Sequence, residues 1–246
     1  MTSGLCTPRL AALAGSPSSP SPAHAETAGT AGTADATGTA GPAAPAEKCE
    51  LCAEPLHDAH RHLLDLEKDE LLCACGACAI LFDDQSAGGR HYRLIPAGRR
   101  ELTGFHLDGP LWAALGVPVD LAFFSVTALG EVSARYPSLA GALHATVHPD
   151  SWRRLVEANP VLEDLRADVE ALVVHRAHPH RAHQHRAHPH RANRHRAQRA
   201  AEHWILPIDD CYRLTALLRE HWTGFGGGDA VWDHISGFFE EMRGER

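Results

Sequence analysis

Five cysteines within 30 residues constrain this chain more than any other feature. They comprise two CxxC pairs and one further cysteine just before the second pair: Cys49 and Cys52, Cys75 and Cys78, and Cys73. Two CxxC pairs separated by a hairpin-length segment can place four thiolates around one tetrahedral ion. We therefore predict that the four paired cysteines bind a metal ion, with three alternative ligands: Cys73, His60 and His62.

The donor set favours Zn²⁺ in a closed tetrahedral site. In a small module such an ion supplies much of the folding free energy, on the order of 10 kcal/mol. Iron in a rubredoxin-like site is the main alternative, because the same four-sulfur geometry accepts it.

The residues around the cysteines predict a small metal-binding module over residues 47–84. Residues 62–73 have the pattern of two short strands around the polar turn Glu67-Lys68-Asp69. The second cysteine pair then leads into an apolar segment, 79–82, that we expect to be helical. A knuckle, a hairpin and a second knuckle opening a helix occur in this order in treble-clef and zinc-ribbon modules.

Residues 1–46 are almost wholly Ala, Gly, Thr, Ser and Pro, without apolar periodicity. Such a segment cannot bury enough apolar surface to offset the entropy of ordering it, so we predict a disordered tail. No apolar run approaches the ~18 residues of a membrane span. Because the thiols cluster at metal-ligand spacing rather than as bridge partners, we expect a cytoplasmic protein.

Residues 85–246 predict an α+β domain, so the whole chain is assigned to the α+β class. Apolar runs predict strands at 91–95, 119–126, 132–136, 169–175 and 204–208, of which 119–126 should be central and buried. A short helix is predicted at 111–115, ended by Gly116 and Pro118. Capping residues followed by periodic apolar positions predict helices from Asp150 to Asn159, from Asp209 or Asp210 to Gly224, and from Asp229 onward. The last helix should bury one apolar stripe: Val231, Ile235, Phe238, Phe239 and Met242. Cys211 is expected to be a buried structural thiol.

A low-complexity insert occupies residues 175–200, where His-Arg-Ala recurs every five residues. We expect a disordered loop at a hairpin tip, because insertions there cost little. Repeat expansion into a solvated basic loop is the favoured explanation of the insert, and weak binding of Ni²⁺, Zn²⁺ or Cu²⁺ is the alternative. Its eight histidines are His175, His178, His180, His183, His185, His188, His190 and His195.

The net charge of −8 is unevenly distributed. Residues 175–199 contain seven arginines and no acidic residue, which leaves 16 basic and 31 acidic residues elsewhere, a net of −15. An acidic body disfavours nucleic acid as the main partner.

Several segments together resemble a family. They are Cys49-Glu-Leu-Cys52, His60-Arg-His-Leu-Leu-Asp65, Cys73-Ala-Cys75-Gly-Ala-Cys78, Leu115-Gly-Val-Pro-Val119, Leu121-Ala-Phe-Phe124, Tyr136-Pro-Ser138, Pro207-Ile-Asp-Asp-Cys-Tyr-Arg213, and Trp232 with Phe238-Phe239. The pattern is similar to an uncharacterised domain-of-unknown-function family of high-GC, actinobacterial-type bacteria, from about Glu47 to Met242. The resemblance implies an association with [NiFe]-hydrogenase genes. The tail and the His-Arg repeat look like additions to that pattern, and Leu139 stands where a proline is more usual.

We therefore predict a non-catalytic zinc-binding accessory protein that supports the assembly or operation of a [NiFe] hydrogenase. Its partner would be a hydrogenase subunit or a maturation factor. The first alternative is a rubredoxin-like iron electron carrier, and the second is a nickel-handling protein that uses the histidine repeat. No nucleophile–base pair is evident in the sequence, so we expect no enzymatic activity.

Overall fold

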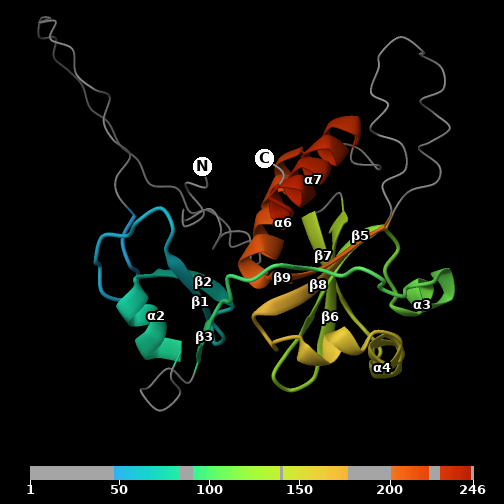
Figure 1. Cartoon of the computed structure of the whole chain (residues 1–246), viewed down its shortest axis with the longest axis horizontal. Helices are drawn as coiled ribbons and strands as arrows, with labels where there is room; N and C mark the ends of the chain where they lie inside the picture. The colour runs from blue at the N-terminus through green and yellow to red at the C-terminus, as the bar shows by residue number, and fades with distance from the viewer. Residues whose placement is uncertain (1–46, 84–90, 139–140, 177–200, 222–227, 245–246) are drawn as a thin grey trace, which may run out of the picture.

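The computed structural model describes residues 47–83, 91–138, 141–176, 201–221 and 228–244, and it has the predicted α+β composition (Figure 1). Two antiparallel sheets organise these residues. The predicted disorder of residues 1–46 and of most of the repeat concerns residues outside this description. Among the described residues, no helix is long and apolar enough to cross a bilayer.

The larger sheet has six strands in the order β4-β9-β8-β5-β6-β7. These strands are β4 (Arg100–Glu101), β5 (Leu121–Val126), β6 (Val132–Ser138), β7 (Gly141–Thr146), β8 (Glu170–His175) and β9 (Glu202–Pro207). The prediction of a central strand at 119–126 is confirmed, because β5 pairs with both β6 and β8. β8 and β9 pair antiparallel, so the repeat connects two neighbouring strands, as expected.

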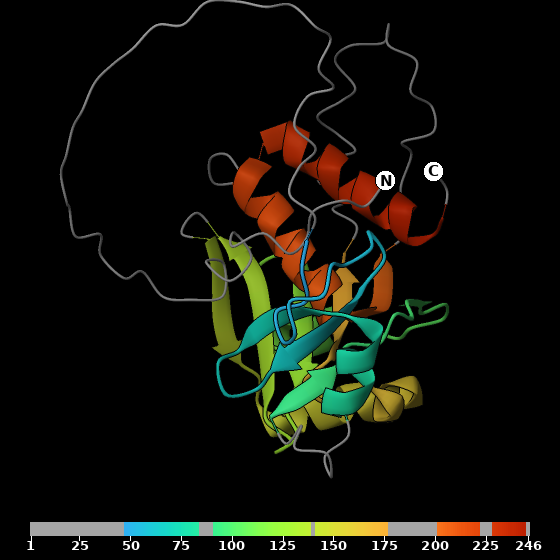
Figure 2. The ribbon, with the colours of Figure 1, turned by 90° about the vertical axis from the view of Figure 1, so that its left-hand side faces the viewer.

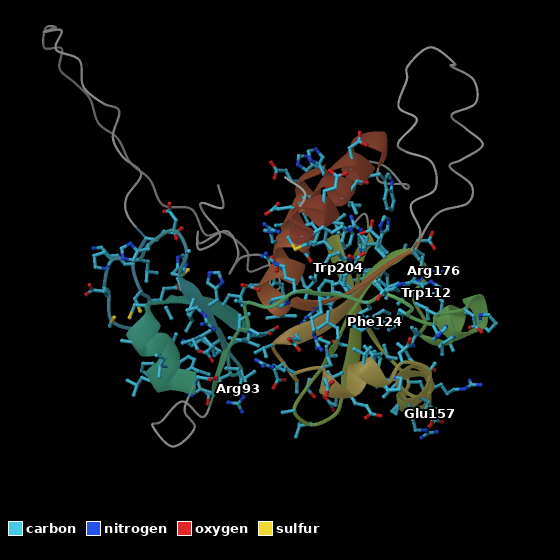
Figure 3. All side chains as sticks on the ribbon, viewed as in Figure 1. Arg93, Trp112, Phe124, Glu157, Arg176 and Trp204 are labelled. Atoms are coloured by element: carbon cyan, nitrogen blue, oxygen red, sulfur yellow. The ribbon has the colours of Figure 1, made fainter. Side chains whose placement is uncertain are left out.

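Helices cover both faces of this sheet (Figure 1). α6 (Ile208–His221) and α7 (Gly228–Met242) lie on one face. The other face carries α3 (Gly109–Ala114), α4 (Pro149–Ala158) and the 3₁₀ segment η2 (Pro160–Asp164). In Figure 3, Trp204 lies towards α6 and α7, whereas Phe124 and Trp112 lie on the opposite side of the sheet.

The central strands are buried on both faces, which explains their nearly continuous apolar sequence. Along β5, Leu121 and Phe123 belong to the core under α6 and α7, while Ala122 and Phe124 belong to the core under α3 and α4. The predicted stripe of α7 is confirmed, since all five of its side chains are buried in the first of these cores.

The smaller sheet belongs to the cysteine-rich part of the chain and has the order β2-β1-β3. The predicted hairpin is confirmed as β1 (Arg61–Asp65) and β2 (Glu70–Ala74), and the predicted helix as α2 (Gly76–Asp83). The buried Asp65 carboxylate accepts hydrogen bonds from the backbone N–H groups of Glu67 (3.0 Å) and Lys68 (3.3 Å), which fixes the hairpin turn.

The strand expected at 91–95 is present as β3 (Tyr92–Leu94), but it pairs with β1 of the smaller sheet. It therefore continues the module's sheet beyond residue 84. Figure 2 shows this sheet and α2 in front of the six-stranded sheet. The division into domains at 1–46, 47–84 and 85–246 stays a prediction.

Two expected helix caps differ from the structure. His148, not Asp150, caps α4, because its Nδ1 accepts a hydrogen bond from the Asp150 N–H. Asp209 and Asp210 lie inside the first turn of α6, where their carboxylates bind other side chains.

Candidate metal centre

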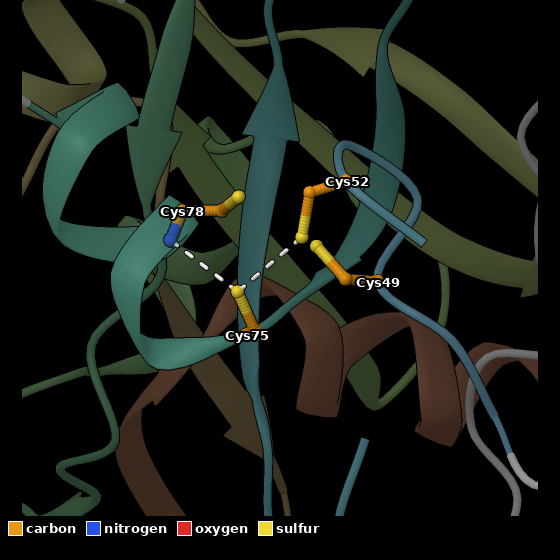
Figure 4. A group of neighbouring side chains, drawn as sticks. All are labelled: Cys49, Cys52, Cys75 and Cys78. Carbon is orange, nitrogen blue, oxygen red and sulfur yellow. Dashed lines mark hydrogen bonds between the residues drawn. The ribbon is translucent and has the colours of Figure 1, made fainter. Parts of the chain in front are cut away.

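The four predicted ligands lie together in the structure, with all of their sulfur atoms within 4.8 Å of one another (Figure 4). The Sγ atoms of Cys52 and Cys75 are 3.7 Å apart. In a tetrahedral site with Zn–S bonds of ~2.3 Å, neighbouring sulfurs are about 3.8 Å apart. The donor set and its spacing therefore fit one metal ion held by four thiolates.

Backbone hydrogen bonds shape the first knuckle. The N–H of Cys49 donates to the Glu54 carbonyl, and the N–H of Ala53 donates to the Cys49 carbonyl, each at 2.8 Å. Ala53 has a φ of 64°, a left-handed conformation that is uncommon for a residue with a side chain. The reversal brings Cys52 back towards Cys49, so that both thiols reach one centre.

Glu50 joins the first knuckle to the strand that leads to the second. Its carboxylate accepts a hydrogen bond from the Cys73 N–H at 2.6 Å, and its own N–H donates to the Cys73 carbonyl at 2.9 Å. These two bonds bridge 23 residues of sequence. Glu50 is thus a positioning residue that spacing alone did not identify, because its partner is a backbone group.

The second pair is positioned by the start of α2. Cys75 immediately precedes the helix, and Cys78 lies in its first turn. The Cys78 N–H points to the Cys75 sulfur at 3.5 Å (Figure 4). Backbone N–H groups at a helix N-terminus favour a negatively charged partner, here a thiolate.

The thiols of the cluster differ in pKa. Burial raises the pKa of the Cys49 thiol, but hydrogen bonds from the backbone N–H groups of Cys75, Leu51 and Cys52 outweigh it and lower that pKa to about 6. Burial, followed by contacts with the other thiols, raises the pKa of Cys78. Four adjacent thiols cannot all ionise without a counter-charge, and a divalent cation supplies one.

Burial differs across the site. Cys49 and Cys78 are buried in a small core with Leu63, Ala74 and Ala79, whereas Cys52 is exposed. One edge of the cluster therefore reaches solvent, while the other edge forms the centre of the module.

The three alternative ligands do not join this cluster. His60, His62 and Cys73 form a second group, in which one ligand atom of each residue lies within 4.8 Å of the others. The structure thus separates two sets of donors that are interleaved in the sequence.

Of the histidines in the repeat, only His175 lies within the described residues. Its ring stacks on Trp232 and Phe239, with centroid distances of 5.8 Å and 5.6 Å. The other seven lie outside the described residues, so their weak metal binding stays a prediction: His178, His180, His183, His185, His188, His190 and His195. The prediction of a buried Cys211 is confirmed, and burial raises its pKa well above the usual value.

Comparisons with known proteins place the chain in a family without giving it an activity. No curated protein matches the chain, and no solved structure matches it. The model of a family of unknown function, DUF5947, matches residues 48–246, which include both groups of candidate ligands and the whole described α+β body. The chain belongs to this family of unknown function.

Proposed function

We propose that the protein is a non-catalytic accessory protein whose Cys49, Cys52, Cys75 and Cys78 hold one structural Zn²⁺ ion. The observation that carries this proposal is the convergence of four sulfurs from two knuckles. Four protein ligands complete a tetrahedral zinc site and leave no position for a substrate, which is the arrangement of structural sites.

The architecture around the cysteines supports a structural ion. The core of the module contains few buried residues, and two of them, Cys49 and Cys78, are themselves candidate ligands. A unit this small gains much of its folding free energy from a bound ion. The order of knuckle, hairpin and helix is that of a treble-clef module, to which we assign residues 47–84.

The partner that we propose is a protein of a [NiFe]-hydrogenase system, either a subunit or a maturation factor. The hydrogenase rests on the resemblance of the sequence motifs. A protein partner is supported by two exposed apolar side chains on α2, since Ile80 and Leu81 are 75% and 51% exposed. We propose that these side chains contact that partner.

The metal assignment is tested by elemental analysis and absorption spectroscopy of the purified full-length chain. We expect one zinc ion at the four-cysteine site, and a colourless sample. Cys75→Ser should bind one zinc ion fewer than the wild type, whereas Cys211→Ala, which removes a buried thiol outside the cluster, should bind as many as the wild type. Equal zinc content in Cys75→Ser and the wild type would overturn the proposed ligand set.

A second candidate function is electron transfer by iron in the same site. The exposure of Cys52 favours it, because an electron carrier needs an edge of its metal site near the surface. It predicts a red protein that bleaches reversibly on reduction, and such a sample would replace the zinc proposal.

The hydrogenase link is tested in a host that encodes both the chain and a [NiFe] hydrogenase. Deletion of the gene should lower hydrogenase activity, and the wild-type chain should restore it. Complementation with an Ile80→Ser/Leu81→Ser variant should fail while this variant retains its zinc. Unchanged hydrogenase activity after deletion would remove the link and leave the metal assignment intact.

A further inference from the structure

The second group of donors lies between the cysteine module and the α+β body. His60 immediately precedes β1, His62 lies on β1, and Cys73 lies opposite His62 on β2. The two imidazole rings are edge to face, with centroids 5.0 Å apart. The Nε2 atom of His60 is 3.1 Å from the Cys73 sulfur. Two imidazoles and a sulfur thus converge on a point outside the four-cysteine cluster.

In both histidines Nδ1 is engaged in a hydrogen bond, so Nε2 is the ring nitrogen that can coordinate an ion. The Nδ1 of His60 is 2.9 Å from the His57 carbonyl oxygen, which can only accept, so Nδ1 carries the proton. The Nδ1 of His62 is 2.7 Å from a carboxylate oxygen of Asp209 and donates to it. In neutral imidazoles, each Nε2 then holds a free lone pair.

The Nε2 atom of His62 is buried, and among the described residues it has no hydrogen-bond partner. Burying an acceptor without a partner costs free energy that a bound ligand would recover, so this atom is available to coordinate an ion. The contact between Asp209 and His62 is also the arrangement in which a carboxylate orients a histidine that binds a metal.

Cys73 supplies the third donor only in a reduced protein. Its side chain is buried, and its sulfur is held in a disulfide bond in this structure. A dithiol reductant cleaves that bond, giving two protein thiols as the reductant becomes a cyclic disulfide. Binding of a divalent ion then displaces the thiol proton of Cys73.

We propose that the reduced protein binds a second divalent ion of the Zn²⁺ class through His60, His62 and Cys73, with Asp209 orienting His62. Two nitrogens and one sulfur are typical zinc donors, and three protein ligands leave the fourth tetrahedral position to water. Asp209 belongs to α6 and the three ligands belong to the module, so one ligand of the ion, His62, is oriented by a residue of the α+β body. This site is independent of the proposed four-cysteine site.

The test counts zinc ions in the full-length chain with the seven repeat histidines from 178 to 195 replaced by asparagine. The protein is reduced with dithiothreitol, loaded with Zn²⁺ and desalted without oxygen. We expect two zinc ions per reduced chain and one per oxidised chain. In the reduced protein, His62→Ala and Cys73→Ser should each bind one ion, whereas His57→Ala, which keeps the carbonyl used by His60, should bind two.

A second measurement does not depend on a variant of the new site. X-ray absorption of the reduced, zinc-loaded protein should show nitrogen ligands at ~2.0–2.1 Å beside sulfur at ~2.3 Å. Cys49→Ser should lose the four-sulfur ion and keep the mixed one, which separates failure of one site from failure of the other. A sulfur-only spectrum, or equal zinc content in His62→Ala and its parent, would overturn the second site.

Discussion

Two adjacent leucines of β1 allow the coupling between metal binding and folding to be measured. Leu63 is fully buried in the core of the module, next to Cys49 and Cys78. Leu64 is 4% exposed and packs into the core beneath α6 and α7. Because successive side chains of a strand point to opposite faces, a Leu→Ala change at each position empties a different core.

Each substitution should cost about 3 kcal/mol, within the ~2–5 kcal/mol that a buried leucine contributes. In the module this loss appears as weaker metal binding, because the ion binds the folded module and not the unfolded one. Since about 1.4 kcal/mol corresponds to a tenfold change, Leu63→Ala should weaken zinc binding about a hundredfold. Leu64→Ala should mainly lower the stability of the α+β body, with a smaller effect on zinc.

The assay pairs a competition titration against a chromophoric zinc chelator with urea unfolding of the zinc-loaded protein. The wild type and both variants are compared in the same buffer. If zinc affinity is the same in Leu63→Ala as in the wild type, the module folds without the ion, and the structural role assigned to the metal is wrong.

Three further predictions concern the α+β body. Burial raises the pKa of Tyr212 to about 12. Because the phenol then ionises more easily in the unfolded state, the free energy of unfolding is intact below pH 10 and falls as the pH rises towards 12. This fall should be about 2 kcal/mol larger in the wild type than in Tyr212→Phe. The buried Asp210 carboxylate accepts two hydrogen bonds from Arg99, at 2.5 Å and 3.0 Å. Because the Arg99 side chain is 40% exposed, water can solvate it when the partner is removed, so Asp210→Ala should cost about 2 kcal/mol in urea unfolding. Phe239 is fully buried, so Phe239→Ala should cost about 3–5 kcal/mol, whereas Leu129→Ala, at a side chain 89% exposed, should change stability by less than about 0.5 kcal/mol.

Each of these predictions has an outcome that contradicts it. Parallel alkaline stability curves for the wild type and Tyr212→Phe would show that this phenol ionises without unfolding the protein. A neutral effect of Asp210→Ala would mean that the ion pair with Arg99 adds nothing to folding. Similar losses from Phe239→Ala and Leu129→Ala would refute the position of the core.

Features encoded by local patterns could be predicted from the sequence. The CxxC spacing identified the four cysteines that converge, and the polar turn between apolar runs predicted the hairpin β1–β2. The apolar run of β5 predicted its central place, and the periodicity of α7 predicted its buried face. In each case the signal lies within one element or between neighbouring elements of the chain.

Features that depend on distant partners could not be predicted. Asp209 meets His62 across 147 residues, and Arg99 meets Asp210 across 111, so both aspartates seemed to be helix caps. The short strand β4 and the strand β7 have little apolar patterning, because each lies at an edge of the sheet. The pairing of β3 with β1 depends on how the chain folds back after α2. The separation of His60, His62 and Cys73 from the other donors follows from the pleat of the hairpin, which spacing does not show.

In our proposal, four cysteines of the module hold one structural zinc ion. Elemental analysis of the purified, full-length protein and of Cys75→Ser decides whether they do. We expect about one tightly held zinc ion per chain at the four-cysteine site, and its loss in Cys75→Ser. Iron in place of zinc, or the same zinc content in both proteins, would refute the proposed site.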